Sequence, residues 1–285
     1  MNVRIGFDVD DTVASLGPLL QAMEGAGAEG GEVGLDLLDT SFLGPMSVVC
    51  LSLAARAWRA QGCVVHAKPP ALRRVAAYAE FSGLAHELGF GPPAVDGHPQ
   101  NVTMPVRFFS TRDNDSILRV GRLIRRFVDM SSDTADVLNV LIAELVQNVA
   151  DHAGAEGAIA ARVYAKRREV RVAVADRGVG LRATLSTHHA VPDDRAALHL
   201  ALQAGASARS SLHNAGLGLD LLDDLLHSNG GSLLIASGRA AYTRNAGRTR
   251  RRVLSAPCAG TLCVMRFRID DELYGSQASS EDLWS

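Results

Sequence analysis

The sequence predicts an α/β (α+β) chain with a small N-terminal α/β domain and a larger C-terminal one. Its 285 residues are enough for two ordinary domains. Residues 89–105 hold four prolines and three glycines, a composition that sustains neither a helix nor a central strand. Strand-like runs alternate with helix-like segments on both sides of this stretch. We therefore predict a domain at 1–90, a linker at 91–105, a domain at 106–270 and a disordered tail at 271–285.

The expected elements follow from the spacing of apolar residues. In the N-terminal domain they are a strand at 4–9, a helix at 16–24, an apolar run at 33–37, a helix at 46–61, a strand at 63–67 and a helix at 71–81. In the C-terminal domain they are a strand at 106–109, helices at 116–127 and 133–152, paired strands at 158–165 and 170–175, a helix at 217–227 and strands at 232–237 and 261–269. A polar, histidine-rich stretch at 181–214 shows no clear period.

Charge and composition exclude several kinds of partner. The formal net charge is −2, so nothing global indicates a nucleic-acid partner or an acidic membrane. The N-terminus lacks the pattern of a signal peptide and no run is long and apolar enough for a membrane span, which predicts a cytoplasmic protein. One local basic cluster is predicted to be a solvated hairpin or loop between two strands, with a binding patch as the alternative: Arg244, Arg248, Arg250, Arg251 and Arg252.

The cysteines and histidines lack the spacing of a metal site. Cys50, Cys63, Cys258 and Cys263 sit singly in apolar runs, which predicts buried, reduced thiols. Four histidines between 181 and 214 are too widely spaced for a compact set of ligands, so we expect them to be solvated: His188, His189, His199 and His213.

Three clusters in the C-terminal domain supply what a nucleotide pocket needs. The first is a helix in which Glu144 and Asn148 stand four residues apart, and therefore on one face. An amide oxygen is a suitable ligand for Mg²⁺, and a carboxylate beside it can orient or deprotonate a nucleophile. Asp151 and His152 follow on the same helix, either as site residues or as polar residues at the helix end.

The other two clusters are rich in glycine. Asp176 ends a strand and precedes Gly178 and Gly180, so its carboxylate can accept a hydrogen bond from an adenine amino group while the glycines let the backbone approach the base. Gly216 and Gly218 open a helix whose free N–H groups would receive phosphate. Each cluster alone is weak evidence for a nucleotide pocket. Their order along the chain is the observation that supports the prediction.

These clusters resemble the N, G1 and G2 boxes of the GHKL superfamily, which includes gyrase, heat-shock chaperones, histidine kinases and mismatch-repair ATPases. The resemblance covers about 165 residues. It implies a two-layer α/β sandwich of Bergerat type, with a mixed sheet and a flexible lid at about 181–215. It also implies ATP and Mg²⁺ as ligands and assigns Glu144 as catalytic base and Asn148 to the metal. The other implied cofactor-binding residues are Asp151, Asp176, Gly178, Gly180, Gly216, Leu217, Gly218, Leu219 and Thr261.

The N-terminal domain resembles the STAS domain of anti-sigma-factor antagonists over about 85 residues. In that family a loop before a helix carries a phosphorylatable serine. The loop here reads Gly44-Pro45-Met46-Ser47, with Met46 at the acceptor position. Ser47 could substitute, and its alternative role is that of a helix N-cap.

A second resemblance points to a different chemistry. The run Asp8-Val9-Asp10-Asp11-Thr12 is similar to the first motif of haloacid-dehalogenase-type phosphatases, in which one carboxylate attacks phosphorus and the next acts as acid and base. The remaining motifs of that fold have no clear counterpart in the chain. We therefore rank phosphatase chemistry at Asp8 and Asp10 below the nucleotide reading.

We interpret the chain as a cytoplasmic regulatory protein of the GHKL superfamily. It would bind ATP with Mg²⁺, hydrolyse it slowly, and couple closure of the lid to binding of an unidentified protein partner. The first alternative is a serine/threonine kinase of the anti-sigma type, because the GHKL resemblance is closest to that branch. The helix 116–127 has no histidine, which argues against an orthodox histidine kinase. Formation of a homodimer stays open.

Overall fold

The structure is a computed structural model of the whole chain, and the described residues are 2–5, 9–24, 26, 31–94, 102–110, 113–127, 132–152, 154–203, 218–228 and 230–268. The N-terminal elements are β1 (Asn2–Arg4), α1 (Val13–Met23), β2 (Glu32–Asp36), α2 (Pro45–Ala60), β3 (Val64–Lys68), α3 (Arg73–Phe81) and α4 (Leu84–Glu87). The C-terminal elements are β4 (Thr103–Phe109), α5 (Asn114–Phe127), α6 (Ser132–His152), β5 (Gly157–Tyr164), η1 (Ala165–Arg167), β6 (Glu169–Asp176), α7 (Gly180–Leu185), α8 (Asp194–Ala201), α9 (Gly218–Ser228), β7 (Ser232–Asn245) and β8 (Arg248–Arg268).

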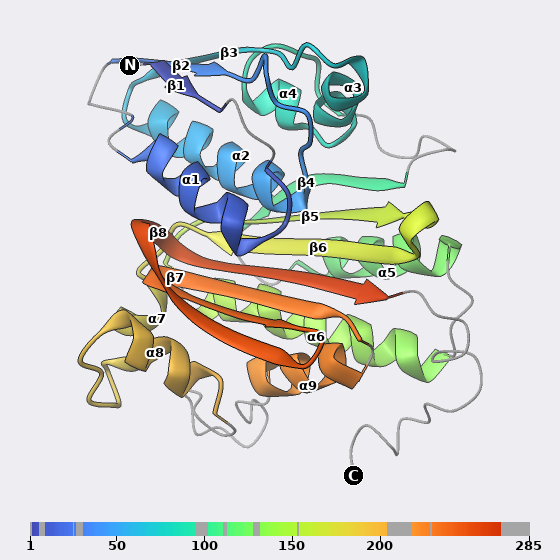
Figure 1. Cartoon of the computed structure of the whole chain (residues 1–285), viewed down its shortest axis with the longest axis vertical. Helices are drawn as coiled ribbons and strands as arrows, with labels where there is room; N and C mark the ends of the chain where they lie inside the picture. Colours follow the sequence, from blue (N-terminus) through green and yellow to red (C-terminus); the bar gives the residue numbers. More distant parts are fainter. Residues whose placement is uncertain are drawn as a thin grey trace.

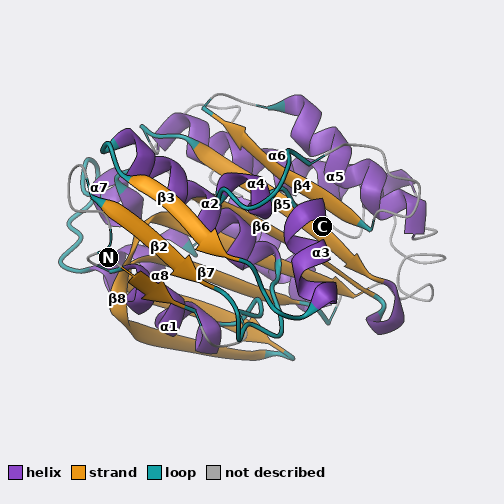
Figure 2. Cartoon of the chain, turned by 90° about the horizontal axis from the view of Figure 1, so that it is seen from above, coloured by secondary structure: helices purple, strands orange, loops and turns teal. Residues whose placement is uncertain are grey.

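The elements form alternating layers (Figure 1). A three-stranded parallel sheet of order β1-β2-β3 lies outermost, and α1 and α2 lie between it and a five-stranded sheet of order β4-β5-β6-β8-β7. α5, α6 and α9 cover the far face of the larger sheet. Seen from above, β2 and β3 run over the inner helices with no helix drawn above them (Figure 2). The larger sheet and its helices form the α/β sandwich that the sequence predicts.

The larger sheet is antiparallel, and the prediction of a mixed sheet was wrong. Each described pairing between neighbouring strands runs in opposite directions. The connections explain this result. β5 and β6 are joined by a tight turn, as are β7 and β8, and two successive helices between β4 and β5 return the chain in the opposite direction.

The N-terminal part and the larger sheet share one hydrophobic core. The face of the sheet toward α2 is lined by small side chains, among them Ala158, Ala160, Ala173 and Ala175, and these belong to the same cluster as Leu51 of α2. Small side chains let a helix approach a sheet closely. The opposite face carries branched residues of the alternate register, which pack against the outer helices. The domain boundaries stay a prediction, but the two parts are packed together across this interface.

Several elements differ from their predicted bounds for local reasons. β4 begins at Thr103, inside the predicted linker, because Pro105 lies at a register irregularity on the edge strand, where a missing N–H is tolerated. At the other end of the sheet, β7 and β8 run on as a long hairpin and pair through the stretch between the two predicted strands. The basic cluster therefore lies on this hairpin, as predicted.

Two predictions concern parts that the structure covers incompletely. The first strand was predicted at 4–9; β1 ends at Arg4, residues 6–8 lie outside the described part, and Val9 forms an isolated bridge with Leu43. The predicted tail at 271–285 lies outside the described residues.

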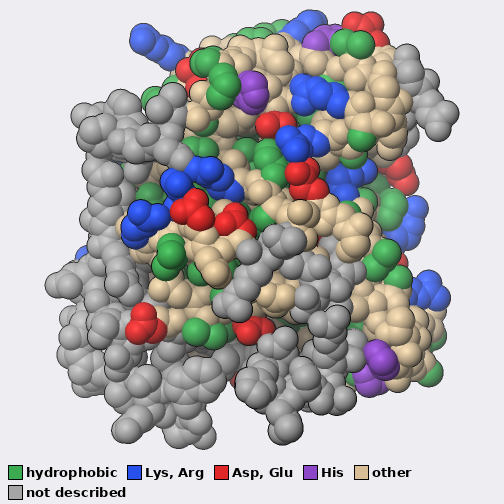
Figure 3. Space-filling model, turned by 180° about the vertical axis from the view of Figure 1, so that it is seen from behind, with side chains coloured by type: hydrophobic (Ala, Val, Ile, Leu, Met, Phe, Trp, Pro, Cys, Tyr) green, Lys and Arg blue, Asp and Glu red, His purple; other side chains and the backbone are tan. Residues whose placement is uncertain are grey.

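All four cysteines are buried free thiols. Among the described residues, no helix has the length and apolarity needed to cross a membrane. On the face seen from behind, Lys and Arg side chains lie interspersed with Asp and Glu side chains (Figure 3).

Candidate nucleotide-binding site

α6 presents Glu144 and Asn148 on its outer side. Glu144 is half-buried and Asn148 is exposed, while Leu141, Leu145 and Val149 are buried against the sheet. The helix is therefore amphipathic, and the predicted pair lies away from its core-facing stripe. Asp151 and His152 belong to the last turn of α6, but their side chains lie outside the described part.

Close packing brings the second half of α6 to the end of β6. Gly157 pairs across the sheet with Asp176, and a Cβ atom at Gly157 would overlap the side chain of Val149 and, at 2.8 Å, Cζ of Phe109. Only glycine allows α6 to lie this close to β5. Because Asn148 precedes Val149, the turn of α6 that carries it lies beside the strand end that carries Asp176.

Asp176 is a buried carboxylate held by backbone donors. Its side chain accepts hydrogen bonds from the N–H groups of Gly178, at 2.7 Å, and Thr261, at 3.2 Å. Burial raises the pKa of Asp176 to about 6, and these two N–H donors act in the opposite direction. A carboxylate fixed in this way still has lone pairs with which to accept a hydrogen bond from an amino group.

Glycines make the turn around Asp176 possible. Gly180 has φ +76°, and a Cβ there would lie 2.9 Å from Oγ of Ser237. Gly260 has φ +71°, and a Cβ there would overlap the Asp176 carboxylate. Both positions combine a left-handed backbone with a close approach, so each requires glycine. The second glycine of the Gly-Val-Gly pattern after β6, Gly180, is thus explained by the geometry of the site.

Ser237 is a site residue that sequence reasoning missed. Its hydroxyl donates to the carbonyl of Gly260, at 2.8 Å, and accepts from the N–H of Leu181, at 2.9 Å. It therefore ties the start of α7 to β7 and β8. Ser237 is buried at the end of an apolar strand run, and a buried polar side chain needs a partner, but the sequence alone does not indicate which one.

The third cluster is described only in part. Gly216 and Leu217 lie outside the described residues, and Gly218 is the first residue of α9. Leu219 is half-buried and packs against the core shared by α6 and α9. α9 contacts α6. The start of α9 and the exposed side of α6 therefore belong to the same layer of helices.

The lid predicted by resemblance is partly helical. Within 181–203 the chain forms most of α7 and all of α8, and α8 packs on β7. The carboxylate of Asp194 accepts from the N–H of Arg239 at 2.7 Å, and His199 lies 3.0 Å from the guanidinium of Arg251. Residues 204–217 lie outside the described part.

The donor set suits ATP with Mg²⁺. Asp176 with its glycine turn offers an acceptor and a close backbone for a purine base, and the α9 start can receive phosphate. Asn148 would offer one oxygen ligand to Mg²⁺, and phosphate oxygens and water would complete the coordination. Among the described residues, no group of three or more His, Cys, Asp or Glu side chains is arranged to hold a metal.

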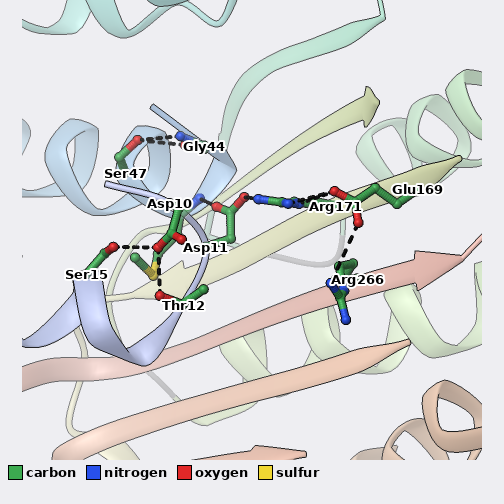
Figure 4. A network of polar contacts seen from close by, with 10 residues as sticks. Asp10, Asp11, Thr12, Ser15, Gly44, Ser47, Glu169, Arg171 and Arg266 are labelled. Atoms are coloured by element: carbon green, nitrogen blue, oxygen red, sulfur yellow. Dashed lines mark hydrogen bonds and ion pairs between the residues drawn. The ribbon is translucent and has the colours of Figure 1, made fainter. Parts of the chain in front are cut away.

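The N-terminal acidic motif serves the packing of the chain. Asp10 accepts hydrogen bonds from Thr12, at 2.6 Å, and Ser15, at 2.5 Å, at the start of α1 (Figure 4). Asp11 accepts the N–H of Met46 at 2.7 Å and pairs with Arg171. Asp8 lies outside the described residues.

The loop before α2 leaves Ser47 enclosed. Its hydroxyl donates to the carbonyl of Gly44, at 2.7 Å, and accepts the Gly44 N–H, at 3.1 Å (Figure 4). The N-cap is therefore Gly44, and Ser47 lies three residues inside the helix. Ser47 is fully buried, so its hydroxyl is not accessible to a kinase in this arrangement.

Comparison with known families agrees with this site. Residues 133–268 match the family model of the histidine kinase-, DNA gyrase B- and HSP90-like ATPases. The match runs from the start of α6 to the end of β8, and so it includes all three clusters. It supports a GHKL-type, ATP-binding domain in this part of the chain. A search among curated proteins finds no match.

Proposed function

We propose that the chain is a regulatory protein that binds ATP with Mg²⁺ and hydrolyses it slowly. The observation that carries the proposal is the placement of Asp176. Asp176 is a buried carboxylate, and the turn around it requires glycine at Gly180 and Gly260. It ends β6 beside the turn of α6 that carries Asn148. The family match at 133–268 supports the same reading.

Each site residue has a defined task in this proposal. Asp176 accepts a hydrogen bond from the adenine amino group, while Gly178, Gly180 and Thr261 shape the backbone around the base. Asn148 holds Mg²⁺, whose positive charge offsets that of the phosphates. Glu144, half-buried on the same face of α6, takes the proton from the attacking water.

The regulatory part of the proposal rests on the packing of α7 and α8. Leu181 and Asp194 fasten the described part of the lid segment to β7 and to the bulge at its middle. Contacts between the ATP phosphates and the end of the lid segment would change the position of that segment on the sheet. This change would alter the surface that the segment offers to a protein partner. We propose that the N-terminal part is a degenerate STAS-like module that contributes to this surface. We also propose that the protein acts in the cytoplasm.

A turnover assay tests the catalytic part. We expect phosphate release from ATP that requires Mg²⁺ and falls at least about a hundredfold in Glu144→Ala, the size typical of losing a general base. Glu80→Ala, at an exposed glutamate of α3, serves as the matched control and should keep the wild-type rate. Equal rates in Glu144→Ala and wild type would contradict the assignment of the base.

The same residues would serve a serine/threonine kinase, because Glu144 could take a proton from a serine hydroxyl instead of from water. Labelled ATP separates the two. Label released as free phosphate supports the ATPase, and label transferred to an added partner protein supports the kinase. ATP binding with neither outcome would leave an interaction module without turnover.

A further inference from the structure

Three arginines stand side by side on the sheet face opposite α6. Arg162 of β5 pairs in register with Arg171 of β6, and Arg171 pairs with Arg266 of β8. Their side chains share the face of Ala160 and Ala173, which packs toward the N-terminal part. We call Arg162, Arg171 and Arg266 the arginine row. Directly opposed like charges repel, so a row of this kind needs compensation.

Two carboxylates compensate the row incompletely. Glu169 bonds Arg171 at 2.6 Å and lies 3.8 Å from Arg266, and Asp11 bonds the remaining side of Arg171 at 3.1 Å (Figure 4). Both carboxylates therefore form their closest ion pairs of the row with Arg171. Within the described residues that contact the row, three guanidinium groups face two carboxylates, which leaves one positive charge in excess.

The row also holds polar atoms without partners. Nε of Arg162, Nε of Arg266 and the hydroxyl of Tyr164 are buried with no hydrogen-bond partner among the described residues. Tyr164 lies between the row and Phe42, and the guanidinium groups of Arg162 and Arg171 lie over its ring at 4.9 and 4.6 Å. An unmade hydrogen bond at a buried polar or charged group is costly, so these three atoms together indicate a missing acceptor.

The outer members of the row can be reached from solvent. Arg162 is half-buried, and the side chain of Arg266 is 31 % exposed. Excess positive charge, unpaired donors and partial access together define a site for an anion.

We propose that the arginine row binds the phosphate group of a small anion, at a site separate from the nucleotide pocket. A phosphate group carries up to two negative charges and several acceptor oxygens, and guanidinium forks match its geometry. The row lies on the sheet face that packs toward the N-terminal part, whereas α6 and its Asn148 lie on the other face. The site therefore does not depend on the proposed ATP function.

The test is a titration of the full chain with inorganic phosphate and with glycerol phosphate at constant ionic strength, followed by calorimetry and by the shift in Tm. We expect Arg162→Gln to weaken phosphate binding by about tenfold or more, because it removes a charged donor. Arg250→Gln, at an exposed arginine of the distant hairpin, is the matched control and should bind as wild type does. Tighter binding of glycerol phosphate than of phosphate would assign a phosphorylated small molecule, and the reverse would assign free phosphate.

A second variant separates a ligand site from a structural cluster. Tyr164→Phe keeps the ring that stacks on Phe42 and removes only the unpartnered hydroxyl. We expect it to weaken phosphate binding while leaving the Tm of the unliganded protein equal or higher. Two results would overturn the proposal: no phosphate effect on the wild type, or an effect that survives Arg162→Gln and disappears in Asn148→Ala.

Discussion

The carboxylate of Asp11 and the guanidinium of Arg171 form an ion pair of 3.1 Å across 160 residues of sequence, with side chains only 3 % and 8 % exposed (Figure 4). Asp11 also accepts the N–H of Met46 at the start of α2. One side chain thus joins the α1 and α2 ends to the central strand of the larger sheet. The N-terminal part is held to the sheet by this polar contact in addition to the apolar core.

We predict that Asp11→Ala lowers the free energy of unfolding by about 3–5 kcal/mol, because Arg171 would remain buried with reduced compensation. Chemical denaturation of the full chain measures the change. The exposed pair of Arg4 and Asp39 is the control, and Asp39→Ala should change the free energy of unfolding far less than Asp11→Ala does. An equal effect of the two substitutions would show that burial does not decide the strength of the Asp11 contact.

Gly260 should be far less tolerant of alanine than another glycine of similar backbone. Gly260 and Gly154 both have positive φ, at +71° and +60°, but a Cβ at Gly260 would overlap Asp176 and one at Gly154 meets nothing within 4 Å. We expect Gly154→Ala to cost about 1 kcal/mol from backbone strain alone. Gly260→Ala should cost at least about 2 kcal/mol more and weaken ATP binding. Thermal unfolding and a binding titration check both, and similar losses at the two glycines would contradict the close approach.

Two buried serines should respond in opposite ways to alanine. Ser237→Ala removes two hydrogen bonds at the site and should lower the free energy of unfolding by about 1–3 kcal/mol. Ser52 is also buried, but its hydroxyl has no partner among the described residues, so Ser52→Ala should be neutral or stabilising. Denaturation of the two variants side by side gives the comparison. A larger loss at Ser52 would contradict the hydrogen-bond assignment at Ser237.

The titration of Asp176 should appear in the pH dependence of stability. Burial raises the pKa of this group in the folded chain to about 6 from its ordinary value of 3.8. The folded state therefore holds the proton more tightly, and the resulting stability is full below about pH 4 and is lost as the pH rises through about 6. From pH 5 to pH 7.5 the wild type should lose about 1 kcal/mol through this group.

Asp176→Asn lacks that group and should show a correspondingly smaller change between the same two pH values. The comparison uses the slope with pH, because the amide also loses an acceptor for one of the two backbone N–H groups and shifts the absolute stability. Identical slopes for the wild type and the variant would mean that the pKa of Asp176 is not raised.

The sequence predicted the elements that carry the three clusters because their signals are local. The helical period of 133–152 and the alternation of 170–175 reproduce α6 and β6 to within one or two residues. The i, i+4 spacing of Glu144 and Asn148 likewise follows from helix geometry alone. The length of the β7–β8 hairpin was missed, since a strand rich in arginine lacks the apolar pattern on which the prediction depended.

The contacts between distant segments could not be predicted from these patterns. Ser237 meets Leu181 and Gly260 only through the order of strands in the sheet, which hydrophobic periodicity does not determine. The acidic run at 8–12 resembles a phosphatase motif locally, yet Asp11 is committed to Arg171, a residue on a strand far along the chain. Short motifs report residue types, and the fold decides which partners they meet.

Equilibrium binding of ATP is the most direct test of the central claim, that Asp176 and the α6 turn of Asn148 form a nucleotide site. Calorimetry of the full chain with ATP and Mg²⁺ should give one saturable site in the wild type. Asp176→Ala should abolish it, and Asn148→Ala should weaken it chiefly when Mg²⁺ is present. Absence of ATP binding by the wild type, or wild-type affinity in Asp176→Ala, would contradict the account.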